Sequence, residues 1–180
     1  MDSDISDEKR VQDLFDYALD REDIKWLLNS MPQTAGVDSN TVEYELQLLK
    51  IVSVGWAVSY YLAGENTKNN ILEPYWQMVR EFSQNLSHAT NLLIGREVDY
   101  FQTLRSRLEL YVQAMTRLQT GAEPVQAIGP EFAQCCGDGK NPFAVLAGSK
   151  MFASCLVNVR MYLHEREELH CGQEPLDGEA

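Results

Sequence analysis

Histidine and cysteine gather near the end of the chain in types that can bind metal. His164, His170 and Cys171 carry side chains that zinc accepts as ligands. A tetrahedral site needs a fourth ligand, which Cys135 or Cys136 would have to supply from a distant part of the chain. Because the spacing supplies only three candidates, we predict no metal site and no other cofactor.

A second metal chemistry is suggested by the single Glu-x-x-His motif, from Glu167 to His170. Paired-metal sites in helical bundles need two such motifs and two further glutamates, all directed inward. The chain has one motif, close to its end, so we expect a solvated acidic tail instead.

Acid–base or thiol catalysis would fall to His88 or to the adjacent Cys135 and Cys136. His88 lies on the polar side of a predicted helix, whereas a general base should lie in a pocket. The two cysteines have no histidine or lysine beside them in sequence that would favour the thiolate. We therefore favour a protein that is not an enzyme.

Aromatic residues at helical spacing could line an apolar pocket between helices. The same spacing is typical of an ordinary core, which is the simpler interpretation. The candidates for lining such a pocket are Trp56, Tyr60, Tyr75, Phe101, Phe152 and Cys155.

The net charge of −12 is concentrated at the two ends of the chain. Residues 1–24 hold nine acidic against three basic residues, and residues 164–180 hold six against one. Residues 25–163 are nearly neutral and show no basic stripe of the kind that nucleic acid requires. We therefore exclude nucleic-acid binding; the acidic ends indicate either solubility or a basic partner.

The stretch IVSVGWAVSYYLAG at residues 51–64 has no charged residue, but a membrane span needs about 20 apolar residues. Within residues 41–63, apolar and small residues recur at steps of three and four on two nearly opposite sides of a helix. A helix that is apolar on both sides is buried all round. A similar pattern spans 142–163, and we predict that these two central helices cross closely through their glycines and serines.

Weaker patterns predict the surrounding helices. Ser6 can cap a first helix that ends at about Leu19. Asp20 can cap a second, short helix that ends near Met31. Asn70 to Glu73 has the form of a capping box, with a proline in the first turn. The helix that follows has an apolar seam formed by Leu72, Tyr75, Val79, Phe82, Leu86, Ala89 and Leu93.

The phase of that seam breaks at Gly95, and a new apolar pattern runs from Val98 to Leu118. We expect the chain to reverse at Gly95 and form an antiparallel hairpin. A short helix should then cover Pro130–Cys136, and Asn141 followed by proline should begin the last helix.

These patterns predict an all-α fold, a compact bundle of six or seven helices. We expect a single domain at residues 5–169 between disordered acidic ends at 1–4 and 170–180. The first residues lack the basic and apolar regions of a signal peptide, so we expect a cytoplasmic protein without a transmembrane segment. The favoured function is a protein-interaction module, such as an adaptor, a chaperone-like factor or an assembly subunit, or a homo-oligomer. The alternative is a bundle that binds a small molecule in an aromatic pocket.

Overall fold

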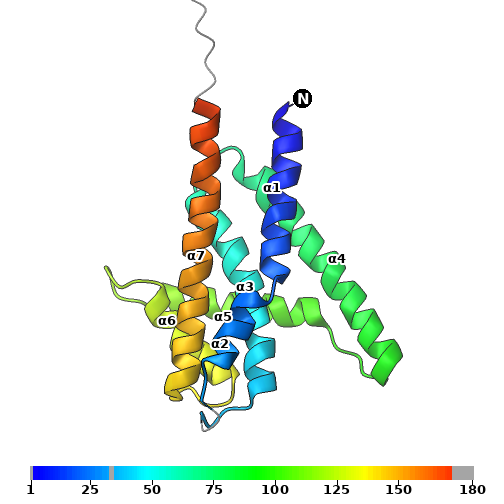
Figure 1. The fold of residues 1–180 in the computed structure, drawn as a ribbon, viewed down its shortest axis with the longest axis vertical. Coiled ribbons are helices and arrows are strands. Elements are labelled where there is room, and N and C mark those ends of the chain that lie inside the picture. The colour runs from blue at the N-terminus through cyan, green and yellow to red at the C-terminus, as the bar shows by residue number, and fades with distance from the viewer. Residues whose placement is uncertain (1, 33–34, 172–180) are drawn as a thin grey trace, which may run out of the picture.

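The computed structural model describes residues 2–32 and 35–171, and the side chains from 7 to 32 and from 35 to 164. The described residues form helices and connecting turns, without a strand (Figure 1). The all-α prediction is therefore confirmed. The helices are α1 (Asp2–Leu19), α2 (Glu22–Asn29), α3 (Ser39–Tyr61), α4 (Lys68–Ile94), α5 (Tyr100–Thr116), α6 (Val125–Cys135) and α7 (Pro142–Cys171).

The helix α3 lies at the centre of the bundle and contacts each of the other helices. Its buried residues occupy all sides of the helix, from Val42 and Leu46 near its start to Ala57 and Val58 near its end. Its most extensive helix neighbour is α7, as the two apolar patterns predict. On another side α7 packs along α6, and its remaining side carries exposed residues such as Val157 and Met161.

The start of α7 agrees with the sequence prediction. The Asn141 side-chain oxygen accepts hydrogen bonds from the backbone N–H groups of Phe143 and Ala144, both at 3.1 Å. Its amide nitrogen donates to the carbonyl of Ala35 at 2.7 Å, so the cap also holds the preceding connection. Pro142 occupies the first helical position, where its missing N–H has no cost.

Several other helix starts were predicted wrongly. Asp20 does not cap α2, because the N-cap position is Arg21, which makes no side-chain cap hydrogen bond. The Asp20 carbonyl instead accepts a hydrogen bond from the buried Lys50 ammonium at 2.7 Å. Pro74 lies inside α4 and has no N–H to donate to the carbonyl of Asn70. Both residues are exposed, so water can hydrogen-bond to that carbonyl. Helices expected to begin at or just after Ser6, Asp20, Asn70 and Pro130 begin instead at Asp2, Glu22, Lys68 and Val125.

The chain turns back at Gly95, as predicted, but α5 runs at an angle to α4 in place of the expected antiparallel hairpin (Figure 1). Gly95 has a positive φ of 65° and donates its N–H to the carbonyl of Asn91 at 2.8 Å, which ends α4. Asp99 then caps α5 by accepting the N–H of Gln102 at 2.9 Å. Figure 1 shows α5 returning from the end of α4 toward the bundle.

The limits of the domain stay a prediction. Helix α1 already begins at Asp2, and α7 continues to Cys171. The part of the expected tail from residue 172 onward lies outside the described residues.

One segment, Pro142–His164 of α7, is long and apolar enough to cross a membrane by length and composition alone. Core helices of globular proteins pass the same test, and α7 packs on α3 and α6 along one side. The expected absence of a transmembrane segment stays a prediction.

Glycines permit close approach of helices, though at other interfaces than predicted. A methyl group at Gly148 of α7 would lie 2.6 Å from the Cβ atom of Phe132 in α6. A methyl group at Gly55 of α3 would meet the ring of Trp76 in α4. Gly55 of α3 therefore leaves room for Trp76 of α4, and Gly148 of α7 leaves room for Phe132 of α6.

We predict that Gly148→Ala destabilises the protein. Overpacking a core costs about 1–3 kcal/mol, while the better helix propensity of alanine returns at most about 1 kcal/mol. Urea denaturation should show a lower free energy of unfolding than wild type. Ser154→Ala, at an exposed position of the same helix, is the control and should be close to neutral; equal stability of the two variants would contradict the assignment.

Candidate functional site

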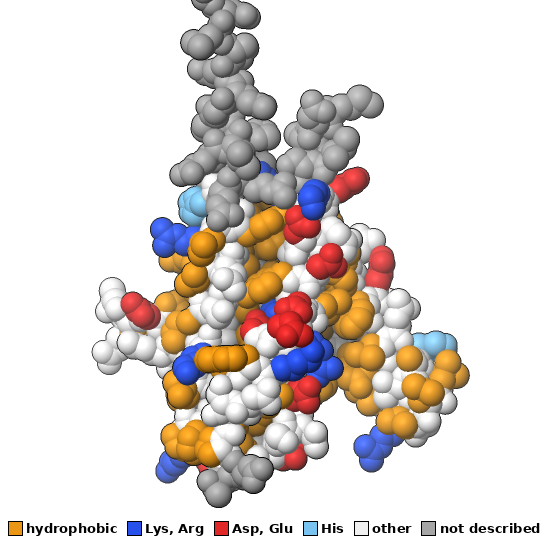
Figure 2. All heavy atoms as spheres, viewed as in Figure 1, with side chains coloured by type: hydrophobic (Ala, Val, Ile, Leu, Met, Phe, Trp, Pro, Cys, Tyr) orange, Lys and Arg blue, Asp and Glu red, His pale blue; other side chains and the backbone are white. Residues whose placement is uncertain are grey.

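The most exposed apolar residues of the described chain lie together where α4 ends. Leu92, Leu93 and Ile94, which we call the apolar tip, are 73%, 84% and 64% exposed. Figure 2 shows the hydrophobic side chains gathered at this end of the molecule, at the right of the view. Apolar patches of this kind mark surfaces that another molecule covers.

The tip exists because α4 is longer than the helices that flank it. α4 has 27 residues, about 40 Å, whereas α1 has 18, about 27 Å. The predicted seam is buried at Tyr75 and Val79, and at Phe82 it meets the ring of Phe15 edge-on, with centroids 6.1 Å apart. Beyond Phe82 the seam continues through exposed positions, including Leu86.

Polar contacts hold this part of α4 against α5. The Ser87 hydroxyl donates to the carbonyl of Ser83 at 2.8 Å and accepts the N–H of Tyr100 at 3.2 Å. The Thr90 hydroxyl lies 3.3 Å from the hydroxyl of Tyr100. The tip is therefore carried by a fixed helix end and not by a loop.

An open groove of about 510 Å³ runs between the same two helices. Arg80, His88 and Phe101 line it, and the Arg80 guanidinium lies 5.8 Å from the centre of the Phe101 ring. His88 is exposed here, as its place on the polar side of the helix predicts. The groove is solvated and lies beside the tip.

The structure brings three of the six pocket candidates together, because the Trp56 ring lies 5.5 Å from that of Phe152 and also contacts Tyr60. Tyr75, Phe152 and Cys155 are buried in the core, and the Tyr75 hydroxyl donates to the carbonyl of Ile51 at 2.8 Å. Trp56 stacks on the exposed Tyr60 with ring centroids 5.0 Å apart. The sixth, Phe101, lines the groove between α4 and α5.

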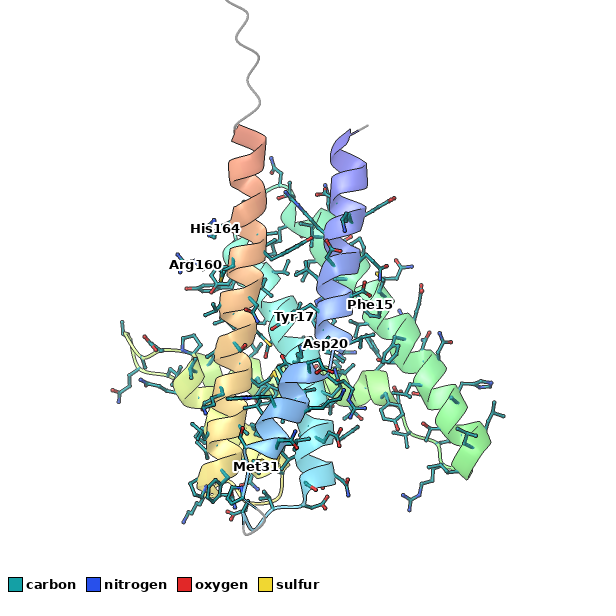
Figure 3. All side chains as sticks on the ribbon, in the orientation of Figure 1. Phe15, Tyr17, Asp20, Met31, Arg160 and His164 are labelled. Atoms are coloured by element: carbon teal, nitrogen blue, oxygen red, sulfur yellow. The ribbon has the colours of Figure 1, made fainter. Side chains whose placement is uncertain are left out.

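Of the zinc candidates, the structure describes the side chain of His164 alone. His164 is exposed on α7, and Figure 3 shows it and Arg160 on the side of the helix that points away from the bundle. The side chains of His170 and Cys171, and those of Glu167 and Glu168, lie outside the described residues. Within the described part, no group of three metal-binding side chains comes together.

One buried cation, Lys50, was not predicted from the sequence. Lys50 of α3 is fully buried, and its ammonium donates to the Asp23 carboxylate at 2.8 Å and to the carbonyl of Asp20 at 2.7 Å. The ammonium also lies 4.4 Å from the centre of the Tyr17 ring. A buried charge is tolerated only when it is paired and hydrogen-bonded, and Lys50 meets both conditions.

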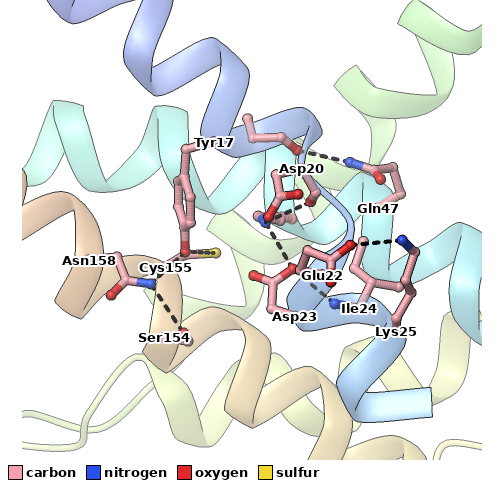
Figure 4. Close-up of polar contacts among 12 residues, drawn as sticks. Tyr17, Asp20, Glu22, Asp23, Ile24, Lys25, Gln47, Ser154, Cys155 and Asn158 are labelled. Atoms are coloured by element: carbon pink, nitrogen blue, oxygen red, sulfur yellow. Dashed lines mark hydrogen bonds and ion pairs between the residues drawn. The ribbon is translucent and has the colours of Figure 1, made fainter. Parts of the chain in front are cut away.

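Tyr17 extends this cluster to α7 (Figure 4). Its hydroxyl accepts a hydrogen bond from the Asn158 amide at 2.8 Å and lies 3.9 Å from the Cys155 sulfur. Burial raises the pKa of the Tyr17 phenol well above its usual value. The cluster therefore joins α1, α2, α3 and α7 around one buried ammonium.

A second buried charge on α3, Glu45, binds Arg107 of α5. The guanidinium donates two hydrogen bonds to the carboxylate, at 2.8 and 2.7 Å, and Glu45 is 3% exposed. The hydrogen bonds to Glu45 raise the pKa of Arg107. This two-point geometry fixes the orientation of α5 on α3.

The two adjacent cysteines, Cys135 and Cys136, lie at the end of α6 near this ion pair. Burial raises the pKa of Cys135 even though the Arg107 guanidinium acts in the opposite direction. Burial raises the pKa of Cys136 and of Cys155 to about 12. These thiols are protonated at neutral pH, so the arrangement favours a structural role over a nucleophilic one.

One signal in the sequence could have located both clusters. Of the three charged residues in the central helix, Glu43, Glu45 and Lys50, the last two lie among its buried positions. A helix buried on all sides cannot expose such charges, so each must find a partner on another helix. The partners could not be identified, because they lie on helices whose packing the sequence does not reveal.

Comparison with known proteins found no matching family model and no curated protein or solved structure of significant similarity.

We predict an asymmetry between the two partners of the buried ion pair. Asp23→Ala leaves the buried Lys50 ammonium with only the half-exposed Asp20 carboxylate at 4.0 Å, and breaking a buried pair in this way costs up to about 3–5 kcal/mol. Lys50→Met should cost less, because methionine fills the space and the partly exposed Asp23 can be hydrated. Urea denaturation measures both. Lys25→Met, which removes an exposed lysine, is the control and should change stability by less than about 1 kcal/mol.

We also predict selective alkylation of the cysteines in a Cys171→Ser background. At pH 8 a thiol of pKa about 12 is a thiolate in about one molecule in 10⁴. Iodoacetamide should modify the half-exposed Cys135 first and leave Cys136 and Cys155 intact in the folded protein. Peptide mass spectrometry measures the order, with guanidinium-unfolded protein as control. Equal rates for all three thiols in the folded protein would contradict the assignment.

Proposed function

We propose that this chain is a non-enzymatic protein-interaction module, an adaptor, chaperone-like factor or assembly subunit, and that the apolar tip is a docking surface. The single observation that carries the proposal is the exposure of Leu92, Leu93 and Ile94 on a fixed helix end. Burying apolar surface is favourable by about 25 cal/mol for each Å² removed from water, and these exposed leucine and isoleucine side chains do not gain that free energy in the free protein. A partner that covers the tip recovers that free energy.

The character of the buried polar groups supports the same proposal. Lys50 and Glu45 each have a carboxylate or guanidinium partner within 2.8 Å. The described thiols are held in their protonated form by burial. These groups are engaged in holding helices together, which leaves the surface as the place of function. A cytoplasmic location belongs to this proposal.

Small-molecule binding is the second candidate, and the groove between α4 and α5 is the observation that favours it. Phe101 provides an aromatic wall, and Arg80 and His88 provide polar groups around it. A ligand held there would be recognised by native mass spectrometry as a small mass excess that is lost on denaturation.

We predict that Leu93→Asp abolishes a complex without unfolding the protein. The carboxylate would have to be desolvated in any apolar interface, whereas in the free protein it is hydrated. Native mass spectrometry of the protein purified from its own host should show a second polypeptide, or a dimer, for wild type. The variant should show the monomer, with an unchanged thermal unfolding midpoint.

The matched control is Val112→Asp, which places the same charge on the exposed side of α5. This variant should keep the complex. If the complex persists in Leu93→Asp, the tip is not the docking surface. If wild type carries a small ligand and no second polypeptide, the result favours small-molecule binding.

A further inference from the structure

A second apolar surface follows the side of α7 that faces away from α3 and α6. Phe143, Leu146, Val157 and Met161 are exposed, and their steps of three, eleven and four residues place them in one stripe along the helix. Lys150 falls in the same stripe. We call these five residues the outer face of α7.

Trp26 of α2 widens the outer face at its middle. Its side chain is 60% exposed, and the Lys150 ammonium lies 5.5 Å from the centre of its ring. Tryptophan and a cation in contact form an anchor of the kind that carries much of the binding free energy in protein interfaces.

Within Pro142–His164, α7 contributes only positive charge to the outer face. From Pro142 to His164 the helix has no acidic residue and contains the two cations Lys150 and Arg160. Neither cation forms an ion pair with a carboxylate among the described side chains. Figure 3 shows Arg160 directed away from the bundle.

The acidic residues of the neighbouring α2 do not cancel this charge. Glu22 lies 2.8 Å from the ammonium of Lys25, and Asp23 lies 2.8 Å from that of Lys50. Both carboxylates are therefore balanced by their own lysines. A protein of net charge −12 thus presents one apolar surface whose free charges are cationic.

We propose that the outer face of α7 binds an amphipathic helix of a partner protein, with glutamate or aspartate beside its apolar seam. The distance along α7 from Phe143 to Met161 is about 27 Å, which a partner helix of about 18 residues covers. Lys150 and Arg160 are about 15 Å apart along the axis. The acidic groups of an aligned partner helix would be spaced about ten residues apart to meet both.

The charges around the outer face favour an acidic partner helix over two other occupants, a second copy of the chain and an anionic lipid surface. A second copy packed antiparallel on this face would bring Lys150, which lies near the middle of the stripe, close to its own counterpart, and like charges oppose that contact. An anionic lipid surface would attract the two cations, but α7 leads directly into Glu165, Glu167 and Glu168, which such a surface repels. An acidic helix meets the cations without meeting the acidic end.

This inference is independent of the apolar tip, which lies on another helix and carries another set of residues. Leu93→Asp should therefore leave binding at the outer face unchanged. The two proposals can fail separately.

The test uses a defined probe, a yeast-displayed library of 18-residue helices selected on the purified full-length protein. The library keeps leucine along one seam and randomises the flanking positions among glutamate, lysine and glutamine. We expect selected helices to carry an excess of glutamate over lysine. The strongest binder, made as a peptide, should lose at least tenfold affinity for the double variant Lys150→Glu, Arg160→Glu and for Val157→Asp.

The matched control is the double variant Lys68→Glu, Arg117→Glu, which changes the net charge equally at positions away from α7. It should bind the peptide within twofold of wild type, and circular dichroism should show that all variants are folded. Failure to select binders, an excess of lysine, or equal loss in the control would overturn the proposal. The proposal would also be overturned if the wild-type protein self-associated, or bound phosphatidylserine vesicles, and Val157→Asp abolished that binding. Either result would identify a different occupant of the outer face.

Discussion

Burial of α3 on every side is the constraint on which the rest of this structure depends. Two of the three charged residues of the helix, Glu45 and Lys50, are buried, and neither can reach bulk water. Lys50 must therefore meet Asp23 and the carbonyl of Asp20, and Glu45 must meet Arg107. An unpaired charge at either position would cost several kcal/mol, so these contacts select one arrangement of the neighbouring helices.

The two ion pairs act on different parts of the bundle. The Lys50 cluster fixes the turn between α1 and α2 on α3 and reaches α7 through Tyr17 and Asn158. The pair of Glu45 with Arg107 fixes α5. Since α5 is held against α3 and α4 is longer than its neighbours, the end of α4 projects with its apolar seam uncovered. The exposed tip is thus a consequence of the length of α4.

Two exposed apolar surfaces with different surroundings suggest different partners. The tip presents three consecutive aliphatic residues at the end of a helix. The outer face of α7 presents a longer stripe with Trp26 and Lys150 in contact at its middle. The buried charges and the described thiols are engaged in holding helices together, and these two exposed apolar surfaces are the observations on which both proposals rest.

The sequence by itself determined the helical class, the central position of α3, the cap of α7 at Asn141 and the reversal at Gly95, because periodicity and capping act over a few residues. It also placed the seam of α4. Only the tertiary structure decided that half of this seam stays exposed, that Asp20 serves Lys50 instead of a helix start, and that Gly55 and Gly148 admit Trp76 and Phe132. These outcomes depend on contacts between residues far apart in the chain, and local pattern carries no information about which helices meet.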